Sequence, residues 1–107
     1  MSAGERDKRI HIQRANDVAN GAGGFHRTWA TIAMAWAKIT PTGGKEALFA
    51  DTLRSVQGFR VEILFRTGLT PVDRFLWGER VLNIRSIEDP DGRRRDLVAF
   101  CETGDDG

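Results

Sequence analysis

Cysteine is nearly absent from the 107-residue sequence, where Cys101 is the single example. One cysteine cannot form an intrachain disulfide and cannot supply a cysteine-based metal site. This scarcity excludes a disulfide-rich secreted scaffold and a zinc finger.

Long hydrophobic runs are missing as well. No segment approaches the roughly 18–20 consecutive apolar residues that a membrane-spanning helix needs. The first ten residues, MSAGERDKRI, are charged from Glu5 onward and contain no apolar signal core. We therefore expect no membrane partner and a location in the compartment of synthesis, where a reducing cytoplasm suits the lone thiol.

Neither sign of charge is in excess, because 16 Lys and Arg face 15 Asp and Glu, for a formal net charge of +1. This balance argues against a dedicated duplex-DNA binder, which carries a basic face. Hydrophobic residues make up 40% of the chain and charged residues 29%, which is typical of a globular body. The length predicts a single domain over residues 1–107 whose stability is modest unless it assembles.

Alternation of apolar and polar residues predicts several β-strands. Arg9–Arg14 places Ile10 and Ile12 on one face, and Phe59–Arg66 places Val61, Ile63 and Phe65 on one face. Phe25–Thr40 also reads as extended, although its alanines leave a short helix open, and Pro41 is expected to end it. The remaining predicted strands are Arg74–Trp77, Arg80–Ile87 and Leu97–Glu102.

Turn residues separate these strands. Asn16–Gly24 is a loop by composition, with several glycines that tolerate positive φ. Gly78-Glu79 predicts a type II′ hairpin, because glycine supplies the positive φ of the first central position. Asp89-Pro90-Asp91-Gly92 has the pattern of a type I turn.

One segment predicts a helix at about residues 44–56. Leu48, Phe49, Leu53 and Val56 recur at helical spacing and form an apolar stripe. Three turns are too short to be stable alone in water, so the segment must pack on something.

Together these elements predict an all-β fold, a small antiparallel β-barrel or sandwich with one short helix in a long loop. Residues 9–102 form the barrel, residues 1–8 a flexible arm and residues 103–107 an acidic tail. The expected core consists of Ile10, Ile12, Trp36, Val61, Ile63, Phe65, Val81 and Ile84.

No residue set predicts catalysis, and no cofactor or metal is expected. His11 and His26 have no ligands at metal spacing and are interpreted as surface histidines, and Cys101 as a packing residue. Arg93-Arg94-Arg95 is the only basic run. Four nearby acidic residues favour a salt-bridged hairpin end over a phosphate-binding patch.

The ordered string of segments from Arg9 to Glu102 resembles the phage head–tail joining family, also called head-closure or stopper proteins. The resemblance rests on the order and spacing of these pieces: Arg9–Arg14, Trp29, Trp36–Ile39 followed by Pro41, Gly43, Gly44 and Glu46, then Phe59–Ile63, Gly68–Pro71 with Arg74, Gly78–Ile84, Asp89–Arg93, Leu97 and Cys101.

The resemblance implies a non-enzymatic virion protein, or a part of a phage-like particle, whose subunits are β-barrels with long loops. Family members form a homo-oligomeric ring, typically dodecameric, beneath the portal and its head–tail adaptor. The ring closes the filled head, DNA passes through its channel, and the tail terminator or tail tube docks on it. The expected location is the particle neck, with assembly in the bacterial host cytoplasm.

We expect the subunit interface to lie in the two long excursions of the chain. The long Pro41–Gly58 excursion is expected to reach outside its own barrel. The residues predicted to contact neighbours are Glu46, Leu48, Phe49, Leu53, Asn20 and Gly21. An alternative function is a small barrel that binds single-stranded nucleic acid through Trp29, Trp36 and Trp77 with Arg85, Arg93 and Arg94.

Overall fold

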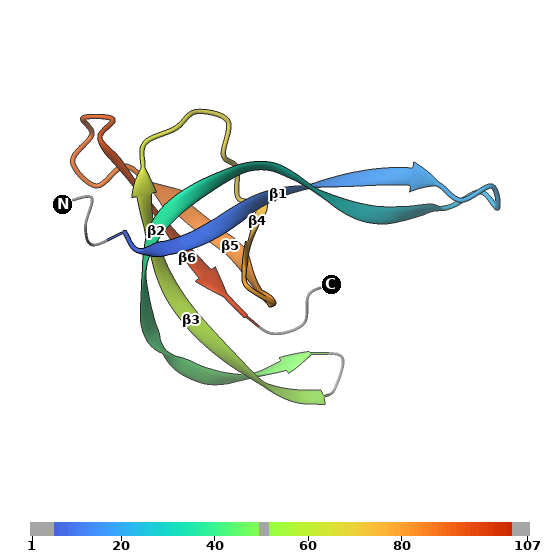
Figure 1. The fold of residues 1–107 in the computed structure, drawn as a ribbon. Coiled ribbons are helices and arrows are strands. Elements are labelled where there is room, and N and C mark those ends of the chain that lie inside the picture. The colour runs from blue at the N-terminus through green and yellow to red at the C-terminus, as the bar shows by residue number, and fades with distance from the viewer. Residues whose placement is uncertain (1–5, 50–51, 104–107) are drawn as a thin grey trace.

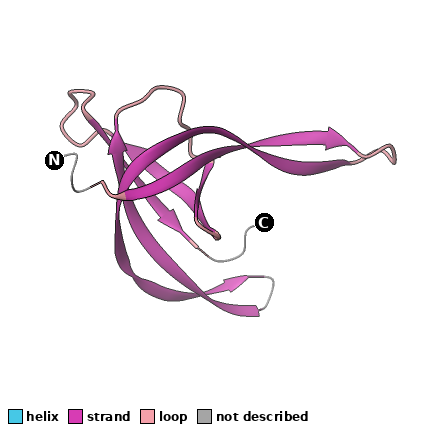
Figure 2. Cartoon of the chain, viewed as in Figure 1, coloured by secondary structure: helices cyan, strands magenta, loops and turns pink. Residues whose placement is uncertain are grey.

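Six antiparallel strands form a closed barrel in the computed structural model, which describes residues 6–49 and 52–103 (Figure 1). Around the barrel the strands follow the order β1-β2-β3-β6-β5-β4. Their bounds are β1 (Lys8–Ala19), β2 (Phe25–Phe49), β3 (Thr52–Leu64), β4 (Arg74–Trp77), β5 (Arg80–Glu88) and β6 (Asp96–Glu102). The described residues contain strands, turns and loops but no helix, so the predicted all-β class is confirmed (Figure 2).

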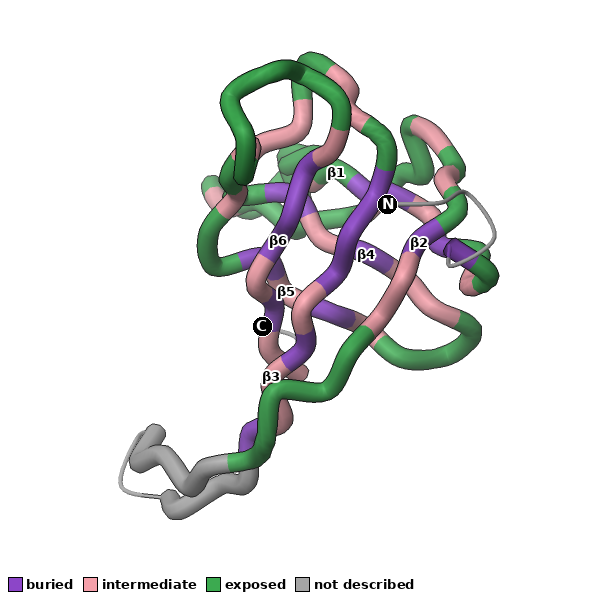
Figure 3. Tube along the Cα trace, turned by 90° about the vertical axis from the view of Figure 1, so that its left-hand side faces the viewer, coloured by how far each residue is buried: buried purple, intermediate pink, exposed green. Residues whose placement is uncertain are grey.

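The core fills the inside of this barrel with residues from every second position of its strands. Phe75 on the short strand β4 is the largest fully buried side chain. The cluster that contains it also includes Ile10, Ile12, Ala37, Phe59, Val61, Ile63, Leu82, Ile84, Leu97, Ala99 and Cys101. The spacing of two residues between these positions places one face of each strand inside, and Figure 3 shows the buried segments on the barrel strands.

Closure of the barrel depends on a short contact between β1 and β4. Only three residue pairs join them, from His11↔Leu76 to Gln13↔Arg74. The β1–β2 register shifts between Ile12 and Gln13, which leaves Ile32 of β2 without a partner in the ladder. Such a bulge bends the strand and increases its twist, so β1 can pair with β2 and β4 at once.

Two hairpin arms project beyond the barrel, because β1, β2 and β3 are longer than its wall (Figure 1). The first arm consists of residues 14–30, where the ends of β1 and β2 pair only with each other. The second arm consists of residues 43–57, where β2 pairs only with β3. The radius of gyration of 15.1 Å exceeds the roughly 13 Å of a compact chain of this length. The arms account for this extended shape.

The helix predicted at about residues 44–56 is wrong. The backbone there forms the second arm, with pairs from Gly44↔Gln57 to Phe49↔Thr52. A three-turn helix has few hydrogen bonds to offset its nucleation. The hairpin instead continues a ladder that β2 and β3 have already formed in the barrel wall, so each added pair costs no new nucleation.

Two predicted strand ends also differ. Asn16–Ala19 was expected in a loop but continues β1, and the loop shortens to the tip of the first arm. Pro41 does not end β2. It pairs with Phe59 beside a register shift at Pro41/Gly43, where a residue without an N–H fits. Bulged Thr42 places its hydroxyl where a Cβ on Gly58 would lie, which explains the glycine opposite.

Trp36 is not a core residue, because 58% of it is exposed. On this part of β2, Ala33, Ala35 and Ala37 face the inside and the larger Met34 and Trp36 are exposed. The small alanines of this segment therefore pack against the core, and its large side chains lie outside. Of the other expected core residues, Phe65 and Val81 are partly buried, and the remaining five are buried: Ile10, Ile12, Val61, Ile63 and Ile84.

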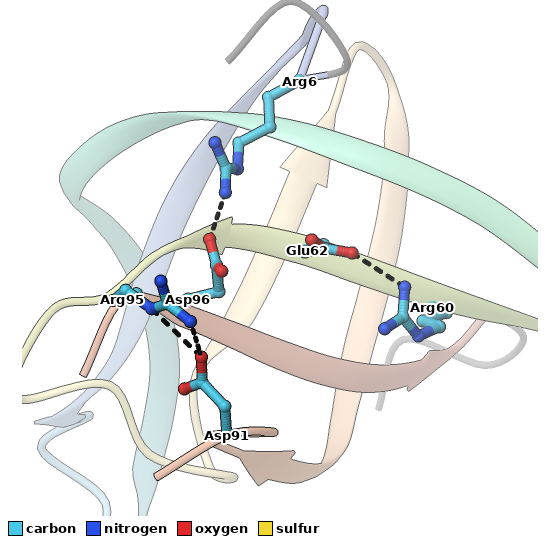
Figure 4. Close-up of polar contacts among 6 residues, drawn as sticks. All are labelled: Arg6, Arg60, Glu62, Asp91, Arg95 and Asp96. Carbon is cyan, nitrogen blue, oxygen red and sulfur yellow. Dashed lines mark hydrogen bonds and ion pairs between the residues drawn. The ribbon is translucent and has the colours of Figure 1, made fainter. Parts of the chain in front are cut away.

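The first described residue contacts the barrel, while residues 1–5 of the predicted flexible arm lie outside the described residues. Arg6 is buried and its guanidinium bonds to the Asp96 carboxylate of β6 (Figure 4). Strand β1 begins two residues later, at Lys8.

Both predicted tight turns are present. Gly78 has a φ of 62°, and Glu79 does not have a positive φ, as a type II′ hairpin requires. The Gly92 N–H donates to the Asp89 carbonyl at 3.2 Å, the closing bond of the predicted type I turn.

Candidate assembly surfaces

Titratable side chains do not gather into a reactive site in the described part of the chain. No group of three His, Cys, Asp or Glu residues there could hold a metal ion, and no helix there is of the length and hydrophobicity to cross a membrane. His26 is exposed and His11 partly buried. Cys101 is 2% exposed, and burial raises the pKa of its thiol to about 12. A thiol in that state is a packing group rather than a nucleophile.

A buried carboxylate fixes the loop between β3 and β4 to the base of the first arm. Asp73 accepts hydrogen bonds from Arg14 Nε and Nη2, at 3.0 and 2.9 Å, and from the Thr70 N–H at 3.0 Å. Arg14 also donates to the Gly68 carbonyl. Burial alone would raise the pKa of Asp73, but these hydrogen bonds and the Arg14 charge outweigh it and hold the pKa below its ordinary value of 3.8. The contact orients the arm relative to the barrel.

The turn that carries the basic run is held by its own acidic residues, as the salt-bridged interpretation predicts. Asp91 accepts from Arg95 Nη2 at 2.6 Å (Figure 4), and Asp89 accepts from the Arg94 N–H at 3.0 Å. The hydrogen bond from Arg95 lowers the pKa of Asp91. Arg94 has a φ of 58° and its guanidinium lies 5.9 Å from the Phe65 ring centre.

The three tryptophans do not form a stacking platform for nucleic acid. Trp29 lies under the Arg74 guanidinium, which is 4.1 Å from its ring centre. Trp77 makes an edge-to-face contact with Phe59, with ring centres 6.2 Å apart. Trp36 is seven residues from Trp29 on the same strand, which corresponds to more than 20 Å along β2.

An apolar surface lies on the outside of the barrel where β1 begins. Met34, Trp36 and Leu64 are each at least half exposed there. With Phe65 they line a hollow of about 720 Å³, whose lining also includes Arg6, Asp7 and Arg66. On β3, two residues before Leu64, Glu62 is buried and accepts from Arg60 Nη1 at 2.8 Å (Figure 4). We call this feature the barrel hollow.

The tip of the first arm is preorganised and exposes an aromatic ring. Asn20 Oδ1 accepts hydrogen bonds from the Ala22 and Gly24 N–H groups, and Gly21 has a φ of 79°. Phe25, the first residue of β2, is 71% exposed. Asn20 and Gly21, which were predicted to contact a neighbour, therefore lie at the outermost turn of this arm.

The other predicted interface residues lie on the second arm. Glu46, Leu48 and Phe49 belong to its β2 half, and Leu53 belongs to its β3 half. In the ladder Leu48 pairs with Leu53, which places them at one register position. Their side chains lie outside the described residues.

The barrel hollow was not predicted from the sequence, although a signal for it was present. Ile32, Met34 and Trp36 alternate with alanines along β2. Both faces of this segment are apolar, one with small and one with large side chains. Only the packing of the folded barrel shows that the alanine face lies inside and the other outside.

The comparisons with known proteins identify the family of this barrel with two arms. Residues 1–104 match the family described as phage head completion protein. The chain belongs to the phage head completion protein family. The resemblance stated from the sequence is therefore confirmed. No curated protein sequence matches the chain.

Two solved structures share the fold. One is a chain of the virion of a native gene transfer agent particle, with a TM-score of 0.77 and 23% identity over 90% of this chain and 92% of that chain. The other is protein SF1141 from Shigella flexneri 2a, with a TM-score of 0.69 and 25% identity over the whole of both chains. This head completion protein is a structural, non-enzymatic virion protein of the head–tail junction.

Proposed function

We propose that this head completion protein forms the ring that closes the DNA-filled head and joins the portal–adaptor to the tail. The carrying observation is membership of the whole barrel and both arms in the head completion family. The structural likeness to a chain of a gene transfer agent virion supports the same role, in a phage or in a phage-like particle. The ring contains several copies, twelve by analogy with the family, and lies in the particle neck after assembly in the bacterial cytoplasm.

The two arms support an assembled state. In a lone subunit, the ends of β1, β2 and β3 pair only within their hairpins and leave open strand edges. Such edges are covered in proteins by partners or neighbouring elements. In the proposed ring, neighbouring subunits, the adaptor above and the tail terminator or tail tube below supply that cover.

The charge balance fits a channel through which DNA passes. The formal net charge of +1 provides no strong attraction for the phosphate backbone. A markedly basic lining would bind passing DNA through counterion release and slow its exit.

The test is to add the purified protein to portal–adaptor complexes and image them by electron microscopy. We expect a new ring of density beneath the adaptor, with a barrel in each subunit position. Complexes that gain no density would contradict the proposal. Particles that assemble and retain DNA normally without this chain would contradict it equally.

A further inference from the structure

The chain exposes more surface than a compact monomer of its mass, and the difference is about the area that one subunit buries in an interface of ordinary size. The chain exposes 6824 Å², whereas a compact monomer of 11.9 kDa exposes about 6,000 Å². The excess of about 800 Å² equals the area that one partner of a standard interface buries. The chain therefore has surface to bury against a partner.

The first arm carries an exposed aromatic side chain, Phe25, which we call the knob and which is mostly uncovered by its own chain. Phe25 pairs with Ala19 at the end of the β1–β2 ladder and leaves 71% of its area exposed. Asp17 and Arg27, which are directly opposite one another two positions from this pair, lie on the same face as Phe25 and form an exposed ion pair. The knob is therefore an apolar group beside one charge of each sign.

The barrel hollow has matching properties. Its lining includes the apolar Met34, Trp36 and Leu64, and its volume of about 720 Å³ lies within the range of ordinary ligand pockets. The lining also includes charges of both signs, Asp7 and Arg66. The arm and the hollow therefore each offer both signs of charge to a partner.

The knob and the hollow lie at opposite ends of β1. Trp36 pairs with Arg9 near the start of this strand, and Phe25 pairs with Ala19 at its end. Ten residues of extended chain separate these positions by roughly 33 Å, and Figure 1 shows the arm tip far from the chain start. A knob cannot reach the hollow of its own chain, but it can reach that of another copy.

We propose that Phe25 on the first arm of one copy docks into the barrel hollow of the next copy. Complementary patches at opposite ends of one molecule produce a head-to-tail contact, which closes into a ring when the rotation per subunit allows. This inference rests on the proposed function, since it identifies one contact of the proposed ring. It adds a knob and a receiving surface that the predicted interface residues do not include.

Cysteine cross-linking in the full chain tests this contact. The double variant A19C/L64C places one thiol directly opposite Phe25 in the ladder and one in the hollow, keeps Phe25 and Trp36 in place, and native Cys101 is buried and does not compete. A disulfide forms only when the two Cβ atoms approach within about 4.5 Å. After mild oxidation of rings on portal–adaptor complexes, and of concentrated free protein, we expect a ladder of multimers beyond the dimer.

The matched control is A19C/V72C, because Val72 is also highly exposed but does not line the hollow. We expect no ladder beyond the dimer from this variant. Normal rings from A19C/L64C without the ladder would overturn the docking contact and leave the proposed function intact. Absence of both ring and ladder would overturn both.

A second measurement uses charge substitutions on exposed positions. F25D removes the knob and W36D removes an apolar side chain that lines the hollow, and each should leave the monomer fold intact because both side chains are mostly exposed. We expect neither variant alone to form rings, while an equal mixture forms one-to-one pairs that do not grow, by native mass spectrometry. Rings of normal size from either variant alone would contradict the inference.

Discussion

Replacement of Asp73 by Asn tests whether the buried carboxylate stabilises the base of the first arm. Asp73 is 2% exposed and accepts three hydrogen bonds, two from Arg14 and one from the Thr70 N–H. An amide retains one acceptor oxygen and loses the charge, so two charge-assisted bonds are weakened or lost. At about 1.5 kcal/mol or more for each such bond, we expect a loss of roughly 3 kcal/mol in the free energy of unfolding at pH 7.

The stability that Asp73 contributes should depend on pH in a defined direction. The folded-state pKa of Asp73 is lowered, so its contribution is complete above the unfolded pKa of about 3.9 and disappears as pH falls through the folded pKa. The difference between wild type and D73N should therefore be constant from pH 7 to 5 and shrink below pH 4. Urea unfolding, followed by tryptophan fluorescence at each pH, measures it.

The control for D73N is D17N, which removes an exposed ion pair with Arg27 from the same arm. We expect little measurable change in stability, as is usual for exposed pairs. A D73N loss that does not exceed that of D17N, or one that stays constant down to pH 3, would refute the reasoning about the buried carboxylate.

Three further predictions address the core, the thiol and the second arm. Phe75→Ala should lower the free energy of unfolding by about 3–5 kcal/mol in urea titrations, because it removes the largest fully buried side chain; a loss below 1 kcal/mol would contradict its role in the core. Cys101 should react with a thiol reagent at pH 8 far more slowly in folded than in urea-unfolded protein, because it is buried with a pKa near 12; equal rates would contradict this. Phe49→Asp should impair ring assembly in electron micrographs more than monomer unfolding in urea, because residue 49 lies at the far end of the second arm; an unfolded monomer would instead make Phe49 a folding residue.

Local signals predicted the parts of this fold that local chemistry controls. The Gly78-Glu79 hairpin and the Asp89–Gly92 turn require particular φ values that few residues tolerate, so the sequence specifies them closely. Strand identity in Arg9–Arg14 and Phe59–Leu64 follows from alternation with one buried face.

The remaining features depend on contacts between distant residues. The apolar spacing from Leu48 to Val56 fits a helix, and only the ladder between β2 and β3 selects the strand. Likewise, the closure of the barrel through three pairs between β1 and β4 has no sequence signature. The exposure of Trp36 depends on which face of β2 packs against the core, and that is decided by all six strands together.

Two bulges allow one continuous strand to serve the barrel and both arms. Within β2, Ile32 lacks a ladder partner where the first arm leaves the barrel, and Thr42 lacks one where the second arm leaves it. Each extra residue shifts the alternation of faces by one position, so the arms are not bound to the inside-outside pattern of the barrel wall. Residues between the bulges must place one face against the barrel core. Residues beyond them do not pack on that core and can carry exposed groups such as Phe25. The same strand that closes the core therefore also positions the surfaces available for assembly.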